Sequence, residues 1–207
     1  MNAATMDIRP VTLTGQHVEL VPLSWDHLPQ AVALAAGQDL FRWFPKQIHS
    51  ADDVHAYFAE AFEAQEAGTA LPFSTFDRAS GQLAGGSRYM AIERSHRRLE
   101  IGSTWIAKTW QRSHVNTEAK LLMLEHAFER LGCLRVEFKT DSLNQPSRTA
   151  LARIGATEEG IFRNHMVTGS GRVRHSVYFS IIDSEWPRVK AGLLAKLAAG
   201  PRLPARS

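Results

Sequence analysis

Hydrophobic and polar residues alternate along several stretches of the chain, and this period of two is that of a half-buried β-strand. Clusters of turn-forming residues separate the stretches. Three of them follow one another between residues 71 and 107, with turns at 77–81 and 93–98, which predicts an antiparallel series. The predicted strands are residues 17–23, 71–76, 82–92, 99–107, 134–140, 160–167 and 173–182.

In other segments, apolar residues recur every three or four positions, as on the buried face of an amphipathic helix. Ser24 and Ser50 precede two of these segments as N-caps, and glycines follow several of their ends. In the helix after residue 115, one apolar stripe from Leu121 to Leu131 is expected to face the core. The predicted helices are residues 25–36, 51–67, 116–131, 146–154 and 184–198.

The resulting order, β-α-α-β-β-β-α-β-α-β-β, predicts an α+β fold with a mixed, mainly antiparallel twisted sheet and helices on both faces. The 207 residues show no repeat and no linker, and 44% of them are hydrophobic, so we expect one domain. Residues 1–12 are predicted to be a lead-in. Residues 184–207 are predicted to be a terminal helix and a frayed tail.

Charge and composition exclude several classes of protein. The net charge is +3, without a dense basic stripe, which disfavours specific nucleic-acid binding. The single cysteine, Cys133, excludes an intrachain disulfide and is interpreted as a small core residue. No run of 18 apolar residues and no signal pattern occurs, so a cytoplasmic location and no membrane partner are expected.

Common catalytic signatures are also absent. The sequence has no phosphate-binding loop of the GxxxxGK[ST] type, no GxGxxG after a first strand and no GxSxG elbow. Its nine histidines lack metal-ligand spacing, so no metal is expected. Hydrolase, dehydrogenase and zinc-enzyme functions are therefore all disfavoured.

The polar loop at residues 110–118 is the most informative segment, because it leads from a predicted strand into the N-terminus of a helix. Free backbone N–H groups and the helix dipole make such a place a seat for a phosphate or diphosphate. The loop therefore predicts a phosphorylated cofactor.

An ordered set of motifs surrounds that loop: LEIG at 99–102, WQR at 110–112, TEAK at 117–120, AFERLGCLRV at 127–136, NQPSR at 144–148 and RIGATEEG at 153–160. This set, with the layout of residues 13–183, resembles the GNAT superfamily of acyl-CoA-dependent N-acetyltransferases. Within it, the chain is similar to the RimJ/RimL-like branch of ribosomal-protein N-terminal acetyltransferases. The resemblance implies acetyl-CoA as co-substrate. It assigns cofactor binding to Trp105, Ile106, Gln111, Arg112, Ser113, His114, Val115, Asn116, Thr117, Asn144 and Arg148.

The loop departs from the family pattern at two positions. His114 and Asn116 stand where the family has small residues. Because His and Asn tolerate positive φ better than most residues, we expect the amides still to converge, with His114 adding bulk beside the cofactor. Asn116 has a second interpretation as an N-cap of the helix, and the two roles are compatible.

The resemblance also implies two catalytic residues. Glu100 would be the base that takes a proton from the acceptor amine, and Ser147 would assist the leaving thiolate. A backbone N–H near Trp105 or Ile106 would stabilise the oxyanion. Glu100 could instead be a carboxylate on an exposed strand face, and Asn144 and Ser147 could be helix caps. Tyr89 and Tyr178 remain alternative acids.

The acceptor pocket is expected around the aromatic loop, with Trp43 and Phe44 in its roof, although both could be core residues. Arg88 could contact an acidic acceptor or face solvent. The acceptor itself, a small-molecule or peptide or protein amine, stays open, as do the acyl group and the oligomeric state, for which a homodimer is one option.

The predicted function is transfer of an acetyl group to a primary amine by direct attack in a ternary complex. Two alternatives remain. One is a catalytically silent acyl-CoA-binding module. The other is a protein that interacts with RNA or the ribosome.

Overall fold

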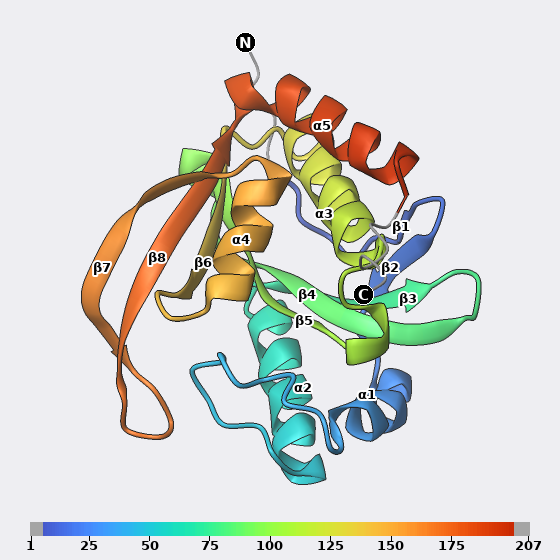
Figure 1. Cartoon of the computed structure of the whole chain (residues 1–207), viewed down its shortest axis with the longest axis vertical. Helices are drawn as coiled ribbons and strands as arrows, with labels where there is room; N and C mark the ends of the chain where they lie inside the picture. Colours follow the sequence, from blue (N-terminus) through green and yellow to red (C-terminus); the bar gives the residue numbers. More distant parts are fainter. Residues whose placement is uncertain (1–5, 201–207) are drawn as a thin grey trace, which may run out of the picture.

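The computed structural model describes residues 6–200, which form an eight-stranded sheet with helices on both faces (Figure 1). The strand order is β1-β2-β3-β4-β5-β6-β8-β7, and every neighbouring pair is antiparallel except β5 and β6. The α+β fold expected from the alternation is therefore confirmed. The strands are β1 Leu13–Thr14, β2 Val18–Pro22, β3 Leu71–Asp77, β4 Gln82–Glu93, β5 Arg98–Ile106, β6 Arg135–Asp141, β7 Thr157–Val167 and β8 Val173–Ile182.

Five α-helices cover the sheet. They belong to two hydrophobic clusters, one on each face of the sheet. On β4, Leu83 belongs to the cluster beneath α1 and α2, whereas the next residue, Ala84, belongs to the larger cluster beneath α3, α4 and α5. Successive strand residues point to opposite faces, so the two groups of helices lie on opposite sides of the sheet. The helices are α1 Leu28–Ala35, α2 Ala51–Glu66, α3 Val115–Glu125, α4 Gln145–Ile154 and α5 Trp186–Ala198.

The predicted helix signals are found where expected. The Ser50 hydroxyl accepts the Asp53 N–H at 3.1 Å and the Asp53 carboxylate accepts the Ser50 N–H at 2.9 Å, so a capping box begins α2. Ser24 also caps, but the turn that it begins is a 3-10 turn, Trp25–His27, and α1 starts only after it. Gly155, with φ +97°, ends α4 as expected.

Helix α3 differs from its prediction in two respects. It begins at Val115, and its last turn, His126–Arg130, is a π-helix. The predicted single stripe was too narrow, because residues around much of the helix are buried. The reason is that α3 packs both on the sheet and beside α5 (Figure 1).

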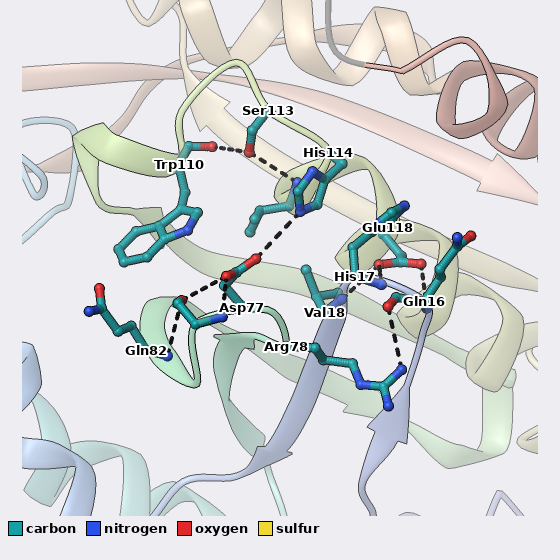
Figure 2. A network of polar contacts seen from close by, with 12 residues as sticks. Gln16, His17, Val18, Asp77, Arg78, Gln82, Trp110, Ser113, His114 and Glu118 are labelled. Atoms are coloured by element: carbon teal, nitrogen blue, oxygen red, sulfur yellow. Dashed lines mark hydrogen bonds and ion pairs between the residues drawn. The ribbon is translucent and has the colours of Figure 1, made fainter.

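The Glu118 carboxylate ties the start of α3 to the first hairpin. It accepts backbone N–H groups from Gln16, His17 and Val18 at 2.8, 2.7 and 2.8 Å (Figure 2). Gly15 must be glycine for this contact, because a Cβ there would lie 2.7 Å from Cδ of Glu118. The charge is buried yet fully bonded, which is the condition under which a buried carboxylate is tolerated.

The ends of the chain are only partly covered by the structure. Within the predicted lead-in, Met6 is buried and Ile8 and Val11 pack against the core. Residues 1–5, and residues 201–207 of the tail that was predicted to fray, lie outside the described part of the chain. Among residues 6–200, no helix combines the length and apolar character needed to cross a bilayer.

Removing the Glu118 anchor tests its importance. Glu118→Ala leaves three backbone N–H groups without an acceptor, so we expect the free energy of unfolding to fall by about 3 kcal/mol. Thermal unfolding measures this. Glu118→Gln keeps one acceptor oxygen and should lose less. Glu125→Ala, at the other end of α3, is the matched control, because its half-buried carboxylate pairs with Lys190 and accepts no backbone N–H of residues 6–200. An equal loss there would refute the anchoring role.

Candidate functional site

A cavity of about 500 Å³ lies where β5 and β6 stop pairing. The two parallel strands are in register only from Arg98 to Glu100, although both continue for several residues. Beyond Glu100 the cavity occupies the space between them, lined by Gly102 and Trp105 on β5 and by Phe138 on β6. It therefore reaches from the α3 side of the sheet toward the α2 side.

Glu100 lies on the wall of this cavity and is 96% buried, with 4% of its surface exposed. Lys139 on β6 places its Nζ 3.4 Å from Oε2 of Glu100. Burial raises the pKa of the Glu100 carboxyl above its ordinary value, and the positive charge of Lys139 opposes that rise. A carboxylate with a raised pKa is better matched to accepting a proton near neutral pH.

Space for the Glu100 side chain comes from Gly102. A Cβ at this position would lie 2.7 Å from Oε1 of Glu100 and 2.7 Å from the Met90 sulfur. The LEIG motif therefore places a carboxylate two residues before a glycine, and the lack of a side chain on this glycine leaves room for the carboxylate.

A β-bulge follows directly on β5. Gly102 opposes Arg88 and Trp105 opposes Gly86, so β5 carries one residue more than β4 between these pairs. Ser103, within the bulge, has φ +48°, in the left-handed region that a non-glycine residue adopts only with strain. Bulges of this kind redirect the backbone beside functional sites.

The N-terminus of α3 opens onto the other end of the cavity. Its N-cap residue, His114, makes no side-chain cap, and the amides of Asn116 and Thr117 have no side-chain acceptor among the described residues. Gln111, Arg112 and Asn116 line the cavity here. Free amides, a helix dipole and a guanidinium together suit a diphosphate.

The loop geometry differs from the expected one. Arg112 takes the left-handed conformation, with φ +62°, whereas His114 is right-handed and Asn116 is the second residue of the helix. Asn116 is therefore not the N-cap. The His114 ring turns away from the cavity, toward His17 at 4.5 Å between centroids and Asp77 at 3.6 Å (Figure 2). The bulk expected beside a cofactor is thus directed elsewhere.

Asn144 and Ser147 lie on the cavity wall at the start of α4. The Oδ1 atom of Asn144 accepts the Ser147 N–H at 3.1 Å, so Asn144 caps this helix, as the structural alternative proposed. Its amide NH₂ and the Ser147 hydroxyl are the groups that can contact a ligand.

The aromatic loop closes the far side of the cavity, with Trp43 and Phe44 on its wall. Arg174, 3% exposed, donates to the Trp43 carbonyl at 3.2 Å. The Gly169 N–H, at the tip of the β7–β8 hairpin, donates to the Pro45 carbonyl at 2.7 Å. The hairpin therefore holds this loop in place.

The structure brings most of the predicted site residues to one cavity. Those on its wall are Glu100, Ser147, Trp105, Ile106, Gln111, Arg112, Asn116, Asn144, Trp43 and Phe44.

The side chains of the other predicted residues lie elsewhere. Arg148 pairs with Glu158 at 3.1 Å, and the Thr117 hydroxyl accepts from Arg153 at 3.1 Å. Outside the cavity wall lie Ser113, His114, Val115, Thr117, Arg148 and Arg88.

Arg88, expected to contact an acceptor or to face solvent, does not face solvent, and it lies outside the cavity wall. It is buried and donates to the Tyr57 carbonyl at 2.9 Å. Of the two alternative acids, Tyr89 donates to the Met123 carbonyl at 2.6 Å inside the core, and Tyr178 is not on the cavity wall.

Three charged residues of the cavity were missed: Lys120, Lys139 and Arg174. Lys120 carried a signal, because it stands four residues before Leu124, on the stripe predicted to face the core. The other two were ordinary charges on alternating strands, and nothing in the sequence marked the side of the sheet that they face.

Comparisons with known proteins find relatives over much of the chain. Residues 17–157 match the model of the acetyltransferase (GNAT) domain family. YdaF of Bacillus subtilis, named as a candidate ribosomal N-acetyltransferase, is 33% identical over 106 residues, which are 51% of this chain and 57% of YdaF. The match thus spans little more than half the length of that relative.

Solved structures extend the likeness to most of the chain. A GCN5-related N-acetyltransferase from Brucella melitensis is 32% identical, with a TM-score of 0.84, over 91% of this chain and 86% of that one. RimJ of Mycobacterium smegmatis, solved with CoA-disulfide, shares the fold at 23% identity and a TM-score of 0.73, over 86% and 88% of the two chains. The chain therefore belongs to the GNAT acetyltransferase family.

Proposed function

We propose that this protein moves the acetyl group of acetyl-CoA to a primary amine by direct attack within a ternary complex. The observation that carries the proposal is one cavity joining an uncapped helix N-terminus to a buried carboxylate. The amides before and within the first turn of α3, with Arg112, suit the diphosphate. Glu100 suits the amine, which must lose a proton before it attacks.

In this proposal Glu100 takes the proton of the acceptor ammonium, directly or through water. The amine nitrogen then bonds to the acetyl carbon and the carbon–sulfur bond breaks, with the Ser147 hydroxyl hydrogen-bonded to the departing sulfur. The second proton that the nitrogen loses passes to this sulfur, so the products are the amide and the free thiol. A backbone N–H at Trp105 or Ile106 stabilises the negative oxygen. Holding a thioester and an amine together supplies much of the rate, because the thioester is already activated.

The acceptor we propose is the N-terminal amine of a protein. The name of YdaF, a candidate ribosomal N-acetyltransferase, supports a protein acceptor, and the cavity wall offers the aromatic side chains of Trp43 and Phe44 to the residues next to the amine. Acetyl as the acyl group, a cytoplasmic location and a homodimer stay predictions.

Release of free thiol from acetyl-CoA and succinyl-CoA, measured against a panel of peptide and small-molecule amines, tests the function. The proposal expects release that depends on one class of amine. Binding of acetyl-CoA without release would instead indicate a silent binding module. Salt-dependent RNA binding, with no thermal shift on adding acetyl-CoA, would indicate the RNA-interacting alternative.

Glu100→Gln should lower kcat/KM by about 100-fold at neutral pH, since a neutral amide accepts no proton. The defect should shrink at high pH, where the amine is already deprotonated. In the native enzyme the rate should fall as pH drops through the raised pKa of Glu100, and the variant should lack that limb. Glu93→Gln, on an exposed strand end, is the control. Identical pH–rate profiles would remove Glu100 from the mechanism.

Lys139→Met tests the electrostatics of the base. The Lys139 charge lowers the pKa of Glu100, so its removal should raise that pKa and move the acid limb of the pH–rate profile to higher pH. Lys139→Arg keeps the charge and should leave the limb near its native position. An unmoved limb in the Met variant would contradict the pairing.

Cys133→Ser should keep full activity. Cys133 is buried in the core away from the cavity wall, and burial raises the pKa of its thiol to about 12, which leaves no thiolate to act as a nucleophile. Rates and intact-protein mass spectra with acetyl-CoA alone measure this. A folded but inactive variant, or an acetyl group on Cys133, would contradict direct transfer.

A further inference from the structure

Lys120 is a lysine that the mechanism above leaves unused. It lies on α3, is 4% exposed, and forms part of the cavity wall between the α3 N-terminus and Glu100. Its Nζ donates to the Thr104 hydroxyl at 2.8 Å and to the Ser87 hydroxyl at 3.3 Å. An ammonium has three N–H donors, so these contacts leave one N–H for another acceptor.

The two hydroxyls lie at the β-bulge. Ser87 faces the position where β5 carries its extra residue, and Thr104 belongs to the bulge itself. Their hydroxyl oxygens are also 2.8 Å apart, so each has a partner without Lys120. The ammonium is therefore not needed to satisfy them.

No carboxylate of residues 6–200 lies within ion-pair distance of Lys120. The charged residues that share the cavity wall are Glu100, Arg112, Lys139 and Arg174. Burial alone lowers the pKa of the Lys120 amine to about 7. A buried ammonium without a counter-charge is costly to keep, and such groups are concentrated at binding and catalytic sites.

We propose that Lys120 is a binding residue for acyl-CoA, and that it donates its remaining N–H to a carbonyl oxygen of the arm that joins the diphosphate to the thioester. This inference rests on the proposed function. Lys120 is placed for the contact because it stands one turn into α3, behind the amides proposed to hold the diphosphate, and contacts β5 four residues after Glu100. The bound carbonyl then supplies the acceptor that the protein lacks.

The contact has a consequence that can be measured without turnover. A bound carbonyl stabilises the charged amine, so Lys120 should take up a proton when acetyl-CoA binds. At pH 7.5 an amine of pKa about 7 is roughly three quarters deprotonated, which sets the upper limit of the uptake. Titration calorimetry with acetyl-CoA, in buffers of different ionisation enthalpy, gives the number of protons taken up per molecule bound.

Lys120→Met isolates the residue. The variant should bind acetyl-CoA about tenfold more weakly and lose the proton uptake seen in the native protein. Lys190→Met is the control, since Lys190 pairs with Glu125 and Glu129 and none of the three lies on the cavity wall; it should keep native affinity and native uptake.

Stability separates a binding role from a structural one. Without ligand at pH 7, Lys120→Met should have an equal or higher Tm, because it removes an unpaired buried charge. Between pH 7 and about 10.5 the unfolded native chain binds the extra proton, so native stability should rise with pH relative to the variant. A variant whose Tm falls at every pH would show Lys120 to be structural and overturn the proposal.

Two further results are decisive and distinct. If the native protein binds acetyl-CoA but Lys120→Met binds it equally well with the same uptake, the role of Lys120 is refuted and the proposed function stands. If the native protein binds no acetyl-CoA, the proposed function itself fails.

Discussion

Strands β5 and β6 pair over three residues and then part, and the functional architecture depends on that separation. It creates the cavity, and it leaves the edge of β5 beyond Glu100 without a neighbouring strand. Backbone groups at such an edge need other partners. The bulge at Ser103 lies on this same stretch of β5 and changes the direction of its backbone. An extended ligand with amide and carbonyl groups could take the place of the missing strand pairing.

Buried charges surround this opening, and the chain satisfies them in different ways. Glu118 accepts three backbone N–H groups and fixes the start of α3. Glu100 faces one lysine across the separated strands. Asp141 is paired with Arg172 and lies near Arg174, which holds the aromatic loop. Lys120 has only hydroxyl partners. Glu118 and Asp141 stabilise the frame, Glu100 faces the cavity as the proposed base, and Lys120 has a donor left for a ligand.

Much of the fold could be predicted because patterns within each short segment of the sequence determine its secondary structure. Period-two alternation located the strands, and Ser50 and Gly155 marked real helix ends. Glu100, Ser147 and the loop at Gln111 were found through motifs, and they do line one cavity.

The predictions that were wrong or missing concern residues whose positions depend on tertiary contacts. The direction of His114 is decided by Asp77 and His17, which are distant in sequence. The left-handed residue of the loop proved to be Arg112, which no propensity favours. The sequence alone suggests that Arg88 is a surface charge, whereas in the structure its guanidinium packs over the Tyr57 ring, with Cζ 4.2 Å from the ring centroid. Lys139 meets Glu100 only because β6 returns parallel to β5.

A crystal structure with bound coenzyme A tests the central claim most directly. The account predicts the diphosphate at the amides between Arg112 and Thr117, with the arm running between β5 and β6 past Lys120 toward Glu100. Coenzyme A bound at another surface, with the space between these strands left free of it, would contradict the account.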